Sequence, residues 1–165
     1  MIKIRNVKME DLKQLVVIEN LCFSKKEAAT KHAFEKRIEL IPDSFFVAEV
    51  DGKIAGFVNG PVIDNVYITD DLFSMTKSNP AKGGHQSILG LAVSPHYQRH
   101  GVAAALLAHL EKEARTNHRE TITLTCKQGL IGFYEKLGYR NCGESASKHG
   151  GVSWYNMCKK LEEFN

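Results

Sequence analysis

The feature that most constrains the fold is an apolar strand that runs into a turn and then a small-residue helix. Gln86–Val93 (QSILGLAV) is apolar enough to be a central strand of a sheet. The polar turn Ser94–His100 follows it, and Gly101 opens a helix that reaches about Arg115. Apolar side chains recur along one face of that helix, at Val102, Leu106 and Leu110. A buried strand joined by a short turn to an amphipathic helix predicts a helix packed on a sheet.

The rest of the chain continues this alternation and predicts one domain over residues 1–165, a length typical of one domain. Further strands are expected at 2–7, 44–50, 53–62, 121–126, 139–147 and 153–161, and further helices at 10–21, 27–40 and 129–137. Asp51-Gly52 predicts a two-residue hairpin turn, because both positions need φ > 0. Residues 63–84, with a short helix at 69–75, are a long excursion and a candidate lid. The order predicts an α/β class, with a mixed sheet covered by helices on both faces.

Composition and charge exclude several classes of protein. The chain is 43% hydrophobic and 25% charged, as in ordinary globular proteins. A net charge of +3 is too small to indicate a nucleic-acid binder, and it suits a small anionic ligand. The longest apolar run, Val102–Ala108, is far shorter than a membrane span of ~20 residues. The start of the chain shows no secretory signal, so we expect a cytoplasmic protein.

Several catalytic and metal-binding patterns are absent from the sequence. It has no P-loop motif and no G-x-G-x-x-G after a strand. Gly143–Ser147 (GESAS) misses the nucleophile elbow G-x-S-x-G by its last residue. The four cysteines are scattered and the histidines form no H-E-x-x-H. We therefore expect reduced thiols and no metal site.

The start of the helix at Gly101 is a candidate anion site. The first N–H groups of a helix lack internal partners and carry the positive end of its dipole. Small residues at 101 and 103–105 let an anion approach the backbone, and Arg99 and His100 add charge. This pattern predicts a diphosphate cradle made largely from main chain. The alternative is a strand–turn–helix whose small residues serve packing.

Two motifs resemble those of the GNAT N-acetyltransferases. Gln98-x-x-Gly101-x-Ala103 is similar to the acetyl-CoA motif of that family, Q/R-x-x-G-x-G/A. Gly132–Tyr139 (GFYEKLGY) is similar to its second signature, F-Y-x-x-x-G-F/Y, and follows a strand as the family requires. The resemblance covers nearly the whole chain. It implies the GNAT fold, with six to seven strands in a central mixed sheet, about four flanking helices, and acetyl-CoA as cosubstrate.

Within that superfamily the chain most resembles the arylalkylamine (serotonin-type) N-acetyltransferases. The resemblance rests on Gly83-Gly84-His85 before the central strand, on Thr125-Cys126 followed by Phe133-Tyr134-Glu135, and on the segment GVSWYNMC near the end. One departure matters: two histidines of the vertebrate enzymes are replaced here by Ser87 and Leu89. Their proton path and substrate therefore do not carry over.

The family resemblance implies roles for particular residues. The backbone of Leu91, Ala92 and Val93 would bind the pantetheine, with an N–H there stabilising the oxyanion. The diphosphate would lie against the segment Arg99, His100, Gly101, Val102, Ala103 and Ala104. Tyr134 matches the family's tyrosine near the sulfur and would protonate the departing thiolate. The alternative is that Tyr134 is a core aromatic residue beside Phe133.

The general base has two candidates. A histidine side chain titrates near neutral pH, so His85 could be the base, or a loop histidine after two glycines. Phe23-x-x-x-Glu27 resembles a segment of insect-type arylalkylamine enzymes in which the glutamate deprotonates the amine. The alternative for Glu27 is the first turn of the second helix, where it would complement the dipole. Cys126, in the apolar run ITLTC, is interpreted as a buried structural thiol.

The family resemblance implies an acetyl-CoA-dependent N-acetyltransferase that acts on a small primary amine, either arylalkylamine-like or aliphatic. One alternative is acetylation of a protein N-terminus or lysine, although the excursion at 63–84 argues against an open acceptor groove. Another is a non-catalytic acyl-CoA-binding module. The oligomeric state is open, a homodimer included.

Overall fold

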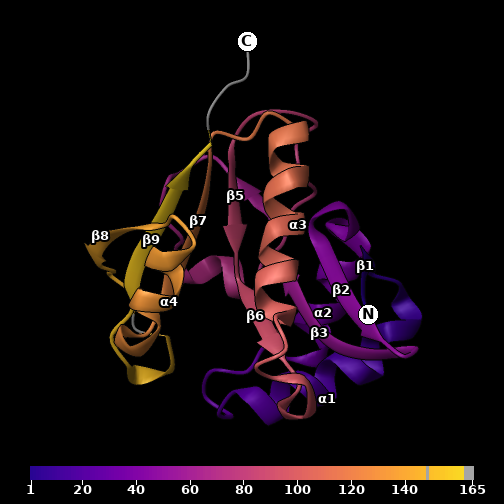
Figure 1. Cartoon of the computed structure of the whole chain (residues 1–165). Coiled ribbons are helices and arrows are strands. Elements are labelled where there is room, and N and C mark those ends of the chain that lie inside the picture. Colours follow the sequence, from indigo (N-terminus) through magenta and orange to yellow (C-terminus); the bar gives the residue numbers. More distant parts are fainter. Residues whose placement is uncertain (148, 162–165) are drawn as a thin grey trace.

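Two β-sheets stand side by side at the centre of the computed structural model, which describes residues 1–147 and 149–161 (Figure 1). The first sheet is antiparallel, in the order β1 (Ile2–Asn6), β2 (Phe45–Val50), β3 (Lys53–Asn59) and β6 (Gly90–Val93). The second runs β4 (Val62–Ile63), β5 (His85–Ile88), β7 (Thr121–Cys126), β9 (Tyr155–Lys160) and β8 (Arg140–Glu144). Its β5–β7 pair is parallel and its other pairs are antiparallel, so the strands are mixed as predicted.

The expectation of one sheet of six to seven strands is corrected by two breaks. The expected strand 53–62 divides into β3 and β4 at Gly60-Pro61, and the expected strand 86–93 divides into β5 and β6 at Leu89. The two segments cross closely at these breaks. A Cβ at Gly60 would collide with the carbonyl of Ser87. Pro61 has no N–H for a ladder. Beyond Ile88 the strand follows β3 instead of β7, so the two sheets separate.

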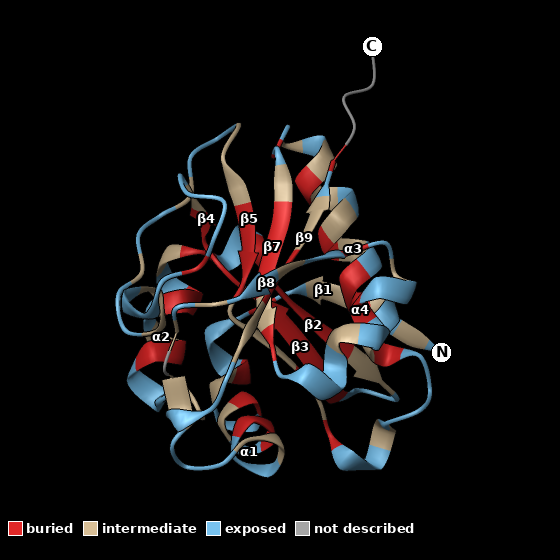
Figure 2. Ribbon diagram, turned by 90° about the vertical axis from the view of Figure 1, so that its left-hand side faces the viewer, coloured by how far each residue is buried: buried red, intermediate tan, exposed pale blue. Residues whose placement is uncertain are grey.

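Helices cover both faces of the first sheet. α3 (Val102–Thr116) packs on one face, and α1 (Leu12–Cys22) with α2 (Lys31–Leu40) packs on the other. Alternate residues of β2 supply the two cores, because successive side chains of a strand point to opposite faces. Phe46 and Ala48 join the α3 core, whereas Phe45 and Val47 join the α1–α2 core. Figure 2 shows the buried residues on these strands and on the inward faces of the helices.

Local signals set several element boundaries. Asp51 (φ 51°) and Gly52 (φ 78°) form the predicted hairpin turn. The second helix begins at Lys31, later than the expected 27, because the Thr30 hydroxyl accepts a hydrogen bond from the Ala33 N–H at 3.1 Å and caps it. In the excursion, the short helix at 69–75 is a 3₁₀ helix, Asp70–Phe73.

The last part of the chain contains less regular secondary structure than expected. α4 (Ile131–Lys136) precedes β8, which ends at Glu144, and β9 begins at Tyr155. A 3₁₀ turn, His149–Gly151, lies between the two strands. We call residues 145–154, apart from 148, the β8–β9 loop. This loop contacts the segment before α2, through His149 and the Glu27 carbonyl oxygen.

Two further features concern the described residues as a group. No helix within 1–147 or 149–161 is long and apolar enough to cross a membrane. The same ranges contain no group of three histidine, cysteine or acidic side chains placed to hold a metal ion. The four cysteines are free thiols.

Candidate active site

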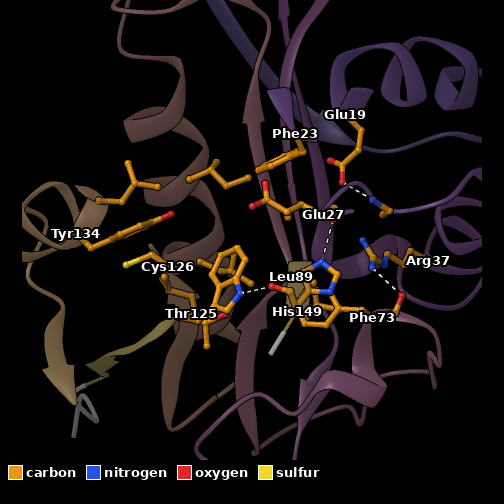
Figure 3. Close-up of a pocket in the computed structure, with 17 residues that line it drawn as sticks. Glu19, Phe23, Glu27, Arg37, Phe73, Leu89, Thr125, Cys126, Tyr134 and His149 are labelled. Atoms are coloured by element: carbon orange, nitrogen blue, oxygen red, sulfur yellow. Dashed lines mark hydrogen bonds between the residues drawn. The ribbon is translucent and has the colours of Figure 1, made fainter. Parts of the chain in front are cut away.

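Two cavities lie in and beside the gap where β6 and β7 part. The inner cavity has a volume of about 100 Å³ (Figure 3). It is lined by Glu19, Phe23, Glu27, Ala29, Arg37, Phe73, Ile88–Leu91, Leu124–Cys126, Leu130, Tyr134, His149 and Trp154. The outer cavity, about 350 Å³, is lined by Leu91, Val93, Tyr97–Arg99, Gly101–Ala104, Leu130, Phe133 and Tyr134. Leu91, Leu130 and Tyr134 belong to both, so two ligands could meet at these residues.

The outer cavity contains most of the residues expected to hold the cosubstrate. Leu91, Val93, Arg99 and the segment Gly101–Ala104 line it. Ala92 points its side chain into the α1–α2 core, and the exposed His100 is not part of the lining among the described residues. The sequence motif therefore forms a wall of this cavity.

The start of α3 is open to a ligand. Gly101 has φ 80°, and no atom lies within 4 Å of the Cβ that another residue would add there. The first main-chain bond of the helix runs from the Ala105 N–H to the Gly101 carbonyl at 3.0 Å. The N–H groups of residues 102–104 thus have no partner within the helix, and no acidic residue lies in its first turn. These features fit the diphosphate of acetyl-CoA, with the apolar wall at Leu130 and Phe133 suited to the pantetheine arm.

Tyr134 stands where the two cavities meet. Its side chain is 5% exposed, and its ring packs edge-on against Phe133 and Tyr139, with ring centres 5.1 and 5.5 Å away. Burial raises the pKa of Tyr134 well above the usual value for a phenol, and Cys126 raises it further. The hydroxyl therefore stays protonated at neutral pH and is available as a proton donor.

Cys126 behaves as a buried structural thiol. It is 2% exposed, and burial raises its pKa to about 11. A thiolate nucleophile requires the opposite shift. The Cys126 thiol therefore stays protonated at neutral pH.

Glu27 lies in the inner cavity, not in the first turn of a helix. It belongs to the turn before Thr30, where its N–H donates to the Ser24 carbonyl at 3.0 Å. Its side chain is 7% exposed, and its Oε1 lies 2.6 Å from Lys127 Nζ. Figure 3 shows its carboxylate between Tyr134 and Glu19. The interpretation as a helix-start residue is therefore wrong, and the carboxylate faces the inner cavity.

The loop that carries Glu27 and the β8–β9 loop are held together. His149 Nε2 lies 3.0 Å from the Glu27 carbonyl oxygen, and the Trp154 indole N–H donates to the His149 carbonyl at 2.6 Å. The His149 ring stacks on Phe73, with ring centres 4.5 Å apart. Residues of the excursion and of the two loops thus line the inner cavity together.

His85 lies elsewhere. Its Nδ1 is 2.8 Å from the Thr121 hydroxyl, and its Nε2 is 3.5 Å from a carboxylate oxygen of Glu120. It lines a separate cavity together with Arg140 and Cys142. The structure brings Glu27 and Tyr134 to one cavity and leaves His85 outside it.

Sequence reasoning missed Glu19 and Arg37, which also line the inner cavity. Glu19 is 5% exposed and accepts a 2.7 Å hydrogen bond from the Ala29 N–H on Oε2. Burial raises its pKa. Arg37 is 1% exposed, and burial lowers its pKa to about 10, which leaves it charged at neutral pH. The signal was spacing: each follows a buried apolar residue by four positions, Leu15 and Ala33, so each charged side chain lies on an inward helix face.

A family model supports the assignment that the geometry indicates. The model of the acetyltransferase (GNAT) family matches residues 12–139. The chain belongs to the GNAT acetyltransferases. It is therefore an acetyltransferase, in a family whose cosubstrate is an acyl-CoA.

Similar proteins agree on the family. An N-alpha-acetyltransferase of Sulfurisphaera tokodaii is 28% identical over 144 residues, covering 84% of this chain and 80% of the relative. GphF, a GNAT-like decarboxylase solved with isobutyryl-CoA, superposes with a TM-score of 0.83 at 19% identity, over 97% and 100% of the two chains. The ribosomal-protein-S18-alanine N-acetyltransferase of Escherichia coli gives 0.73 at 20%, over 100% and 97%. These two structures show the shared fold. None of the three is an arylalkylamine enzyme by name, and that closer likeness stays a prediction.

Proposed function

We propose that this GNAT enzyme transfers acetyl from acetyl-CoA to the α-amino group at the N-terminus of a peptide or protein. The observation that carries the proposal is the meeting of two cavities at Tyr134, one suited to the cosubstrate and one charged and suited to an amine. The N-alpha-acetyltransferase relative and the S18-alanine enzyme of the same fold support an α-amino acceptor.

The outer cavity would hold the cosubstrate. When bound, acetyl-CoA supplies the acetyl group as a thioester that a neutral amine attacks directly. The backbone at the start of α3, with Arg99 and His100 beside it, would bind the diphosphate. The backbone of Leu91, Ala92 and Val93 would hold the pantetheine arm, with one N–H directed at the carbonyl oxygen as negative charge develops there. Phe133 supplies an apolar wall.

Two side chains would move protons. Glu27 accepts a proton from the acceptor ammonium, which makes the nitrogen nucleophilic. As the new N–C bond forms and the C–S bond breaks, the Tyr134 hydroxyl protonates the sulfur. The nitrogen loses its second proton, which restores the tyrosine. The net reaction converts an ammonium ion and the thioester into an amide, a free thiol and one proton.

A free small primary amine is the second candidate acceptor. The size of the inner cavity, about 100 Å³, supports it, as does the contact between the two loops that line the cavity. An amine of the arylalkylamine or aliphatic kind would use the same two proton-transfer residues.

The experiment is thiol release from acetyl-CoA with matched acceptors. Peptides that begin with Ala, Ser or Met are compared with the same peptides blocked at the α-amino group but carrying a free lysine. Tryptamine, phenethylamine and propylamine form the third set. We expect turnover with free N-termini and little with blocked ones, and mass spectrometry should place the acetyl group on the α-nitrogen.

Two outcomes would overturn the proposal. Turnover with the amines but not with any peptide would favour the second candidate. Turnover with blocked, lysine-containing peptides would indicate a lysine acetyltransferase.

A further inference from the structure

The wall of the inner cavity across from Tyr134 carries two buried charged side chains that each have an unpartnered atom (Figure 3). In Glu19, Oε2 is bonded to the Ala29 N–H, whereas Oε1 has no hydrogen-bond partner among the described residues. In Arg37, one terminal nitrogen donates to Asn59 Oδ1 at 3.2 Å and the other to the Phe73 carbonyl at 3.3 Å. Its Nε has no partner within the same part of the chain.

These two atoms are chemically complementary to a particular kind of ligand. A buried polar atom without a partner is costly, and the cost is greatest for charged groups. Oε1 of Glu19 is an acceptor that favours a cation, and the Arg37 Nε–H is a donor that favours an oxygen. The charges of Glu19 and Arg37 attract each other. No ion pair within 4.0 Å joins them among the described residues, so Oε1 and Nε–H are left without a hydrogen-bond partner.

We propose that Glu19 and Arg37 recognise the first residue of the acceptor. The Glu19 Oε1 accepts a hydrogen bond from the α-ammonium group, and the Arg37 Nε–H donates to the carbonyl oxygen of that residue. This inference rests on the proposed function. An α-amino acyl group carries a cation and a carbonyl on the same carbon, whereas an alkylamine or arylalkylamine offers only the cation. The pair therefore selects peptide N-termini over simple amines.

Glu19 and Glu27 have different surroundings and so different tasks. Glu27 is paired with Lys127 and lies on the Tyr134 side, where a proton must be removed. Glu19 is deeper and fixed by the Ala29 N–H, which favours a role in binding and positioning. Loss of Glu19 should therefore act mainly on the KM of the peptide, and loss of Glu27 mainly on kcat.

The pH dependence of the peptide KM follows from the groups that face Glu19. Burial raises the pKa of the Glu19 carboxyl. The hydrogen bond from the Ala29 N–H, Arg37 of α2 and His149 of the β8–β9 loop lower it by less, and Cys22 lies beside it on α1. The carboxyl thus loses its charge at a higher pH than an ordinary glutamate does. As the pH falls through that range the ammonium loses its partner, so the peptide KM should rise.

The test is Glu19→Gln, with Glu39→Gln on the exposed face of α2 as the matched control. The amide keeps the size of the side chain and an oxygen for the Ala29 N–H, so the fold should be retained, as circular dichroism and melting would show. We expect the peptide KM to rise by about tenfold or more, the loss expected when about 1.4 kcal/mol of binding is removed. The KM for acetyl-CoA should not change, the peptide KM should become independent of acidic pH, and Glu39→Gln should match the parent.

A second measurement uses the unmodified enzyme and so does not depend on folding of a variant. Alaninamide is compared with 3-methylbutan-2-amine, which has nearly the same shape but no carbonyl, at equal concentrations of free base. We expect kcat/KM to be at least about tenfold higher for alaninamide, and Glu27→Gln to lower kcat for both.

The two measurements test the roles of Glu19 and Arg37 separately. A Glu19→Gln enzyme with the peptide KM and pH profile of the parent would overturn the role of Glu19. Equal kcat/KM for the two small acceptors would overturn the role of Arg37. If the parent acetylates no peptide at all, the proposed function itself fails, which is a separate result.

Discussion

Tyr134 and Tyr139 show how position decides what one side chain can do. Both are 5% exposed, and burial raises the pKa of each. Their rings are in edge-to-face contact, yet Tyr134 lines both cavities and Tyr139 lines neither. Tyr139 therefore makes a matched control for any effect of removing a buried phenol hydroxyl.

Tyr134→Phe should lower kcat by roughly 10²–10⁴-fold, the usual contribution of a general acid. The KM for acetyl-CoA should hold, because the ring and its packing remain. The measurement is steady-state kinetics across a pH range, alongside Tyr139→Phe. Equal turnover of Tyr134→Phe and Tyr139→Phe would leave Tyr134 as a packing residue.

How far a residue could be assigned from sequence depended on whether its signal was local. Tyr134 lies in a contiguous motif, and Glu27 lies in a short loop segment, so both were candidates before the structure was known. Glu19 and Arg37 meet only when α1 and α2 pack together. His85 was a candidate base by its residue type, with a loop histidine as the alternative, and its partners Thr121 and Glu120 are distant in sequence.

At the scale of elements, the junction of β6 and α3 combines backbone shape with charge. Gly101 adopts the left-handed region, which Asn and Asp tolerate better than other side chains. A Cβ there meets no atom within 4 Å, so a short side chain has room at this position. Asp and Asn are nearly equal in size, so a comparison of the two isolates the effect of a negative charge at this position.

Gly101→Asp should weaken the binding of acetyl-CoA clearly more than Gly101→Asn does, because the carboxylate repels the diphosphate. Both variants should fold, as circular dichroism would verify. The measurement is acetyl-CoA affinity by calorimetry at low and at high salt, since screening should narrow the difference between the variants. Identical affinities for Asp and Asn would place the diphosphate away from this helix start.

Other elements show which sequence signals predict the observed element boundaries. The Asp51-Gly52 turn was predictable because the φ angles of two adjacent residues determine it. The division of the strand at Leu89 was not, since the apolar pattern runs through the break and the cause is the close crossing at Gly60. The capping side chain of Thr30 could have predicted where α2 starts, whereas the apolar periodicity of the segment could not.

The molecule as a whole consists of two sheets that part around the candidate site. The α3 core spans both, since it joins Phe46 and Val58 of the first sheet to Ile122 and Met157 of the second. The outer cavity likewise takes residues from β6 in one sheet and from α4, which packs against β8 and β9 in the other. A ligand in that cavity would therefore contact both halves and stabilise them together.

This arrangement predicts that acetyl-CoA raises the melting temperature of the whole chain in one step. At a concentration one hundred times the Kd, a ligand that binds only the folded state adds ~2.7 kcal/mol. For a domain of this size that corresponds to a rise of roughly 5–11 °C. Trp154 is the only tryptophan and lies in the β8–β9 loop, so its fluorescence reports on the second half, while far-ultraviolet circular dichroism reports on both.

The two signals should show coincident transitions, with and without acetyl-CoA, as a two-state domain requires. Gly101→Asp is the control, and it should melt like its own ligand-free form at the same acetyl-CoA concentration. A shift confined to the fluorescence transition would mean that the ligand stabilises only the half that carries Trp154. In that case the α3 core does not couple the two sheets, and the cavity between them is not where acetyl-CoA binds.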